Sequence, residues 1–125
     1  SDADVLIHAL MDAMLGAAGL RDIGYYFPPE DDQYKGISSM ILLKHVNSLL
    51  KERGLEAYNI DIMVISETPK LKPHIDTMKA NLQSVLEIPL ERISIKATTN
   101  EMLGAIGRRE GIAAQAVVSV YEGEV

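Results

Sequence analysis

The sequence predicts an α+β fold in which a small mixed β-sheet has its helices packed on one face. Apolar residues recur at helical spacing in three segments, and they alternate or run continuously in three others. These segments follow the order helix, helix, strand, helix, strand, short helix, strand, and a strand–helix–strand unit favours a right-handed, parallel arrangement. No repeat, linker or low-complexity tract divides the 125 residues, so residues 1–125 are expected to form one domain.

Composition argues against several classes of function. The chain holds 12 Lys and Arg against 18 Asp and Glu, and the resulting net charge of −6 disfavours nonspecific binding to nucleic acid or anionic membranes. Cysteine is absent, which excludes disulfides, thiolate metal sites and a cysteine nucleophile. No apolar run approaches the ~20 residues that span a bilayer, and no signal peptide is recognised. We therefore expect neither a nucleic-acid nor a membrane partner.

The first helix is expected over residues 4–18, with Asp2 or Asp4 as its cap and Gly19 at its end. It is apolar over most of its circumference, as is typical of a buried helix. Asp4, His8 and Asp12 fall on one stripe. Asp4 and His8, one turn apart, could share a metal ion. Equally, Asp4 could complement the helix dipole while His8 binds backbone or solvent.

Residues 21–36 are expected to form a long loop, because the segment holds two Pro, two Gly and an acidic cluster. Loops of this length are often functional. A second helix is expected from Ser38 to Arg53, stopped by Gly54. Its predicted apolar face comprises Ile41, Leu42, Val46, Leu49 and Leu50.

Residues 58–66 predict a central strand because both of its faces are apolar. A turn over residues 68–73 then leads into a third helix, expected over residues 74–86. Further strands are expected over residues 92–97 and 111–121, and a short helix should open at residues 98–101 and end near Gly104. One face of the central strand carries Ile60, Ile62 and Val64, and the other carries Met63 and Ile65. Three strands make a thin sheet for so apolar a chain. Either a strand is missing or the sheet is buried against other subunits.

Two segments could bind an anion. Lys70 and Lys72 lie in a Pro-bounded turn at the carboxyl end of a strand, where ligands of α/β sheets often bind. The alternative is a solvated connection. Residues 96–101 leave a strand and enter a predicted helix, so Thr98, Thr99 and the first-turn N–H groups could cradle a phosphate.

Glu101 could hold a divalent cation on that phosphate, although an ordinary capped helix start explains residues 98–101 equally well. Arg108 and Arg109 could form a second anion site or a surface pair. The sequence contains no glycine-rich mononucleotide loop and no nucleophile elbow. These features together predict metal-assisted handling of a phosphorylated ligand without a covalent intermediate.

Several motifs, in register from residue 1 to the C-terminus, resemble the 2-C-methyl-D-erythritol 2,4-cyclodiphosphate synthase family. The resemblance implies a step of non-mevalonate isoprenoid biosynthesis in which a 2-phosphate attacks the β-phosphate of a diphosphocytidyl group and CMP leaves. It also implies a homotrimer whose sheets face the trimer centre, with each active site between subunits and an isoprenoid diphosphate as a possible ligand of the central cavity. The matching segments are residues 1–4 with His8, 12–17, 19–24, 27–28, 69–74, 95–101, 107–108 and 110–113.

The family pattern also implies roles for individual residues. His8 resembles a zinc ligand, Glu101 resembles the ligand of a second cation (Mg²⁺ or Mn²⁺), and Thr99 resembles the residue that stabilises the transition state. Residues 66–72 resemble the cytidine pocket, and residues 27–31 resemble a flexible loop over the substrate. The implied substrate-binding residues are Ser1, Asp22, Ile23, Gly24, Phe27, Pro28, Pro29, Glu30, Asp31, Ser66, Glu67, Thr68, Pro69, Lys70, Leu71, Lys72, Thr98, Thr99, Asn100, Glu101, Ala105 and Arg108.

The sequence departs from the family pattern at its start, at Ala105, and at Ile106 and Arg109. The Asp-x-His pair of the family's first strand, which supplies the other zinc ligands, is absent, so an N-terminal strand region is expected to be missing and activity of this chain is doubtful. Ala105 stands where many relatives have Phe, in the segment that lines the trimer cavity. Alternatives are a non-catalytic trimeric cytidine-nucleotide-binding module, or a fragment of a bifunctional cytidylyltransferase fusion. The expected location is a bacterial cytoplasm or a plastid stroma.

Overall fold

The computed structural model describes residues 2–68 and 70–123, and in them a three-stranded mixed sheet has the strand order β2-β1-β3. The central strand β1 (Leu55–Ile65) pairs in parallel with β2 (Ile93–Thr98) and antiparallel with β3 (Ala113–Glu122). β1 is therefore the central strand that its two apolar faces predict. Ser1 and Pro69, two of the expected substrate-binding residues, lie outside the described residues.

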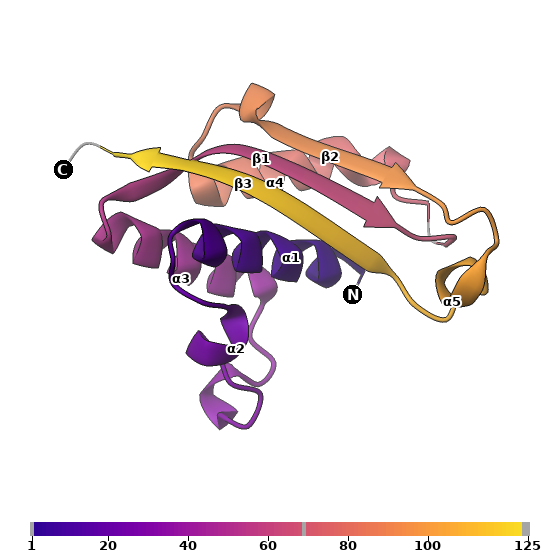
Figure 1. The fold of residues 1–125 in the computed structure, drawn as a ribbon, viewed down its shortest axis with the longest axis horizontal. Coiled ribbons are helices and arrows are strands. Elements are labelled where there is room, and N and C mark those ends of the chain that lie inside the picture. The colour runs from indigo at the N-terminus through magenta and orange to yellow at the C-terminus, as the bar shows by residue number, and fades with distance from the viewer. Residues whose placement is uncertain (1, 69, 124–125) are drawn as a thin grey trace.

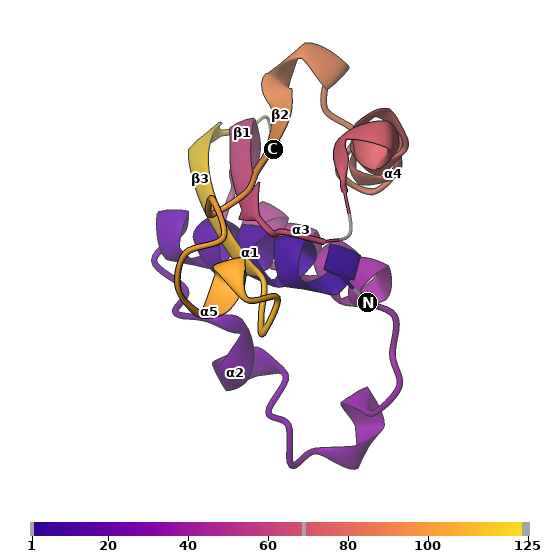
Figure 2. The ribbon, with the colours of Figure 1, turned by 90° about the vertical axis from the view of Figure 1, so that its right-hand side faces the viewer.

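The helices cover one face of the sheet, as Figures 1 and 2 show. α1 (Asp2–Ala17) packs against β3 and β1, α3 (Ser39–Glu52) packs against α1, and α4 (Ile75–Leu86) packs against β2. β1 alternates accordingly, with Ile60, Ile62 and Val64 fully buried and the residues between them half-buried. The α+β class, the mixed sheet and the parallel β1–α4–β2 unit are thus confirmed.

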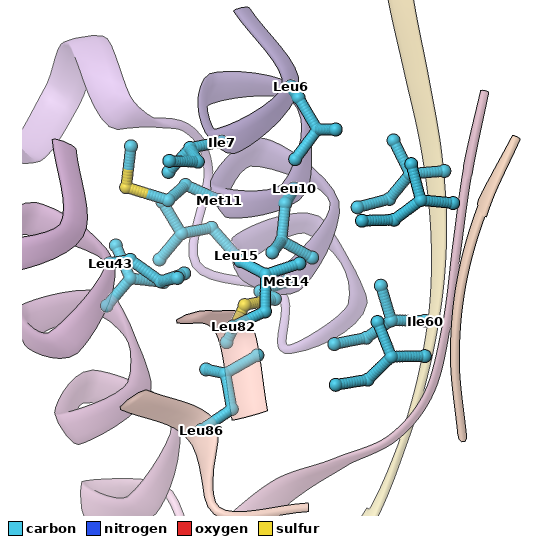
Figure 3. Packing of buried hydrophobic residues seen from close by; sticks show 14 of the residues in the cluster. Leu6, Ile7, Leu10, Met11, Met14, Leu15, Leu43, Ile60, Leu82 and Leu86 are labelled. Carbon is cyan, nitrogen blue, oxygen red and sulfur yellow. The ribbon is translucent and has the colours of Figure 1, made fainter. Parts of the chain in front are cut away.

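The core lies between the sheet, α1 and α3. Leu6 and Leu10 point from α1 toward the strands, whereas Ile7 and Met11 point toward Leu43 of α3 (Figure 3). Leu10 and Met11 have no exposed surface, because the sheet covers one side of α1 and α3 covers the other. α1 is therefore enclosed by its own domain except along its polar stripe, where His8 and Asp12 are exposed.

Several predicted boundaries were wrong. α1 begins at Asp2, so Asp4 lies within it. The predicted start of α3 is confirmed, because Ser38 is its N-cap and the Ser38 Oγ accepts a hydrogen bond from the Met40 N–H (3.2 Å). β1 starts at Leu55, and a register shift between Ala57 and Asn59 leaves Tyr58 without a Cα partner in β3. Bulged strand ends are hard to foresee because the extra residue breaks the period of two.

Two further predictions need correction. The segment expected to be a loop over residues 21–36 contains the short α2 (Ile23–Tyr26) and a 3-10 turn at Asp32–Tyr34. Aspartate side chains induce both, because Asp22 accepts from the Tyr25 N–H and Asp31 from the Gln33 N–H. On α3, Ile41 is 61% exposed and Leu43 is buried instead. Residues 40–43 are four apolar residues in a row, so their spacing does not define the buried side.

The remaining elements are a 3-10 turn at Lys72–His74 before α4, another at Leu90–Arg92 before β2, and α5 (Gly104–Gly107) before β3. Among the helices that the structure describes, none has the length and apolar character needed to cross a bilayer.

Candidate functional site

A pocket of about 240 Å³ opens where β1 and its parallel neighbour β2 both end. Its floor is apolar, because Val64 and Ala97 are register partners on the two strands and Leu71 is 8% exposed. Its rim carries cations and hydroxyls from two loops. The lining residues are Val64, Ser66, Lys70, Leu71, Lys72, Ala97, Thr98 and Thr99. The structure thus brings together the two segments that the sequence singled out as anion sites.

The turn after β1 is held by its own hydrogen bonds. The Ser66 N–H donates to the Thr98 carbonyl (3.0 Å) and so extends the strand ladder by one step. The buried Ser66 hydroxyl donates to the Thr68 carbonyl (2.8 Å). With Leu71 buried between them, Lys70 and Lys72 are exposed at the pocket mouth. This arrangement offers two cations to an anionic ligand without burying either charge.

The loop after β2 is not the helix start that the sequence predicted. Residues 99–103 precede α5, and both Glu101 (φ 53°) and Met102 (φ 62°) have left-handed backbones. The Glu67 carboxylate accepts hydrogen bonds from the N–H groups of Asn100 (2.6 Å) and Met102 (3.1 Å). The expected first-turn N–H cradle is therefore occupied by a carboxylate of this chain, which excludes these two donors from phosphate binding in this conformation.

The two threonine hydroxyls of this segment differ in their hydrogen bonds. Thr98 Oγ1 donates to the Thr99 carbonyl (3.4 Å), whereas Thr99 Oγ1 accepts from the Glu101 N–H (3.3 Å). Because Thr99 Oγ1 acts as an acceptor there, its hydroxyl hydrogen is free to donate into the pocket that Thr99 lines. Asn100 is turned away from this role, since its Nδ2 donates to the Leu103 carbonyl (2.9 Å).

The predicted substrate loop lies away from this pocket within the chain, at the bottom of Figure 1. The Ile23 N–H donates to Asp12 Oδ1 (2.9 Å), which ties the loop to α1. Phe27 is buried, with its ring edge-on to Tyr34 and His45 at centroid distances of 5.2 and 5.4 Å. Asp22 caps α2, and Gly24, Pro29 and Glu30 are exposed. None of residues 22–31 lines the pocket.

The predicted metal ligands are not clustered. Asp4 accepts a hydrogen bond from the Ser39 hydroxyl (2.7 Å), and His8 is exposed one turn further along α1. Glu101 is exposed beside Thr99 but does not line the pocket. Across residues 2–68 and 70–123, no group of three His, Cys, Asp or Glu could hold a metal ion. The described residues alone therefore do not fit a three-ligand zinc site.

Residues near α5 lie outside the pocket lining. Ala105 is exposed in α5, and the Arg108 Nε donates to Glu110 Oε2 (2.7 Å) within its own loop. A Cβ on Gly107 would overlap the backbone of Met102, so α5 packs directly on the loop that carries Thr99.

The sequence model of the YgbB family matches residues 1–121. The chain belongs to this family. The 2-C-methyl-D-erythritol 2,4-cyclodiphosphate synthase of Nostoc punctiforme is 57% identical over 118 residues, which are 94% of this chain and 74% of that protein. The protein of the same name from Thermosynechococcus vestitus is 56% identical over 123 residues, 98% of this chain and 76% of that protein. The expected family resemblance is confirmed.

Solved structures of YgbB-like proteins share the fold. The bifunctional IspDF of Campylobacter jejuni superposes with a TM-score of 0.89 at 46% identity, covering 93% of this chain and 31% of that chain. IspF of Plasmodium falciparum, in complex with CDP, superposes with a TM-score of 0.84 at 31% identity, covering 96% of this chain and 72% of that chain. The chain thus spans about three quarters of the length of its curated relatives in the YgbB family.

The sequence does not predict the contacts of Glu67. The resemblance places Glu67 in the cytidine pocket, whereas in the structure its side chain reaches the loop after β2. An acidic residue between a strand end and two lysines was the available signal, because a carboxylate so close to an anion site needs another partner.

Proposed function

We propose that the chain binds 4-diphosphocytidyl-2-C-methyl-D-erythritol 2-phosphate and cyclises it to 2-C-methyl-D-erythritol 2,4-cyclodiphosphate with release of CMP. Membership of a family whose curated members bear the name of this synthase supports the reaction. The observation that carries the proposal is the pocket itself, at the ends of two parallel strands, which is lined by Lys70, Lys72, Thr98 and Thr99.

The pocket suits a nucleoside diphosphate. Its apolar floor of Val64, Ala97 and Leu71 offers a surface for a base, and the backbone of the turn after Ser66 offers hydrogen-bond groups to it. Lys70 and Lys72 would offset the negative charge of the diphosphate. The complex of P. falciparum IspF with CDP supports the same ligand class for this chain.

The chain's own residues would promote an intramolecular attack. The substrate carries both the attacking phosphate and the leaving CMP, so holding one geometry makes the reaction effectively unimolecular and needs no enzyme nucleophile. Thr99, with its free hydroxyl hydrogen, would donate to the phosphate oxygen on which charge builds up. Lys70 would hold a phosphate of the cytidine moiety in place.

The proposal includes a divalent cation at Glu101 but no complete zinc site. A single carboxylate together with substrate phosphates is a common way to bind Mg²⁺, so exposed Glu101 could hold Mg²⁺ or Mn²⁺, which would neutralise phosphate charge. His8 would be one zinc ligand, but the described residues bring no group of three ligands together, and no step is routed through zinc.

We further propose a homotrimer with the open face of the sheet toward its centre. That face is half-exposed and apolar at Met63 and Ile65, and Val117 is 72% exposed. The loop of residues 22–31 projects away from the pocket of its own chain and so could reach the pocket of a neighbour. Ala105 and Arg108 would then border the central cavity, where an isoprenoid diphosphate could bind.

The test of the pocket is a calorimetric CDP titration of the parent chain and the Lys70→Ala variant. Loss of one charge-assisted bond should weaken CDP binding by about 1.5–3 kcal/mol. Lys51→Ala is the matched control, because Lys51 is an exposed lysine in the last turn of α3 and does not line the pocket. Equal affinities of the parent and Lys70→Ala would show that Lys70 belongs to a solvated connection and does not bind the ligand.

CMP release from the diphosphocytidyl substrate, measured on the same proteins, separates the enzyme from the alternative of a non-catalytic CDP-binding module. Release by the parent that falls in Lys70→Ala supports the synthase. CDP binding without CMP release supports the binding module.

A further inference from the structure

The turn after β1 and the loop after β2 are joined by one carboxylate. Glu67 Oε2 accepts from the Asn100 N–H (2.6 Å) and Glu67 Oε1 accepts from the Met102 N–H (3.1 Å). The side chain is half-buried, and its partners lie 33 and 35 residues further along the chain. Hydrogen bonds from backbone N–H groups to a carboxylate are among the stronger ones in proteins.

The loop that Glu67 holds has a backbone that is costly for its residues. Glu101 and Met102 are successive non-glycine residues with left-handed φ angles, a conformation that persists only where neighbouring groups impose it. One such group is α5, which packs against the Met102 backbone at Gly107. The other is the Glu67 carboxylate, which accepts from the N–H groups on either side of Glu101.

The negative charge of Glu67 is not explained by a role in the turn after β1 alone. A carboxylate beside a pocket for phosphates repels them, so its presence disfavours the proposed ligand unless it contributes something else. The turn itself does not depend on this side chain, because Ser66 already fixes it through the Thr98 and Thr68 carbonyls. What Glu67 contributes is the position of the loop that carries Thr99.

We propose that Glu67 is a positioning residue that fixes Thr99 at the phosphate end of the pocket by bridging the Asn100 and Met102 N–H groups. The proposal rests on the proposed function for the identity of the ligand, whereas the bridge itself does not. Because Glu67 acts through Thr99, its substitution should lower the affinity for ligands that carry phosphates. It should not change the affinity for the base.

The first arm of the test measures the bridge directly, by NMR amide exchange on the full chain. Glu67→Gln keeps the shape of the side chain but turns an NH₂ group toward one of the two N–H donors. Exchange at Asn100 or Met102 should therefore accelerate by about tenfold or more. Glu91→Gln is the control, because Glu91 is exposed at the opposite end of β2. Unchanged exchange at both amides in Glu67→Gln would overturn the bridge.

The second arm uses two ligands, CDP and cytidine. Glu67→Gln should weaken CDP binding about tenfold or more and leave cytidine within about threefold. Removal of the negative charge alone would tighten CDP binding, so a tighter CDP complex overturns the proposal. Equal losses for CDP and cytidine would mean that Glu67 serves the turn and not the loop, which also overturns it.

The third arm is a double-mutant cycle with Thr99→Ala. If Glu67 acts through Thr99, the double variant should bind CDP no more weakly than Thr99→Ala alone, whereas independent roles would give additive losses. Additivity would overturn the proposal. A parent chain that binds no CDP would sink the proposed function and with it the role of Glu67 toward phosphate, while the exchange arm would still report on the bridge.

Discussion

The two faces of the β-sheet differ although their residues are neighbours in sequence. On the covered face, Ile60, Ile62 and Val64 have no exposed surface beneath the helices. On the open face, Met63 and Ile65 are half-buried, and Val117 of β3 is 72% exposed. The open face also carries an ion pair, because Lys96 Nζ lies 3.0 Å from Asp61 Oδ1.

The difference teaches that apolar composition alone does not say what covers a strand. Both faces of β1 are apolar enough for burial, but within the single chain only one of them has helices packed on it. A sheet face of this kind is typical of a protein–protein contact, and the proposed trimer accounts for it. If so, the two faces should respond differently to matched substitutions.

The largest effect is expected from Ile62→Ala. Ile62 is fully buried, so its truncation should lower the free energy of unfolding by about 2–5 kcal/mol through lost burial and a cavity. The neighbouring Met63→Ala should cost clearly less at dilutions where light scattering gives the mass of one chain. Urea denaturation of both variants at that dilution measures the two losses. Equal losses would contradict the distinction between the faces.

A smaller free-energy effect with a clear readout is expected from Val117→Asp. A charge at this exposed position of the edge strand β3 should oppose burial of the open face, so the assembly constant should fall by at least about tenfold, or 1.4 kcal/mol. The unfolding free energy of the isolated chain should change by no more than about 0.5 kcal/mol, as for most surface substitutions. Light scattering at micromolar concentration should show about three chain masses for the parent and a lower mass for the variant. A parent that is a monomer would contradict the proposed trimer.

The smallest effect is expected from Lys96→Met in the dilute chain. The Lys96 and Asp61 side chains are 50% and 43% exposed, so their pair should contribute about 0–1 kcal/mol to the unfolding free energy. Screening by salt should reduce even that difference, whereas it should not affect Ile62→Ala. A loss above about 2 kcal/mol in urea denaturation of the single chain would show that the open face behaves like the core.

Much of the fold followed from local pattern. The alternation in β1 gave both faces correctly because side chains of a strand alternate strictly, and the strand–helix–strand unit gave the parallel pairing of β1 and β2. The sequence singled out the segments of Lys70 and Thr98 separately, and the structure joins them in one pocket because the carboxyl ends of neighbouring parallel strands share one edge of the sheet.

The parts that were missed depend on contacts distant in sequence. Residues 98–101 have the composition of a capped helix start, but the Glu67 carboxylate 33 residues earlier takes up the N–H of Asn100 and favours a different loop. The prediction that Ile41 belongs to the buried face of α3 was wrong. Residues 40–43 are all apolar, so only the position of α1 decides which of them is covered. Propensity and period carry no information of this kind.

The contact between α1 and β3 joins almost the first described residues to almost the last. The face of α1 that packs on β3 therefore stays uncovered until residues 113–122 have been synthesised. At about 5–20 residues per second, a ribosome needs several seconds to make the roughly 100 residues in between. For that time the apolar residues of α1 are available to chaperones or to other nascent chains, and a chain without β3 should be insoluble because it would leave them uncovered for good.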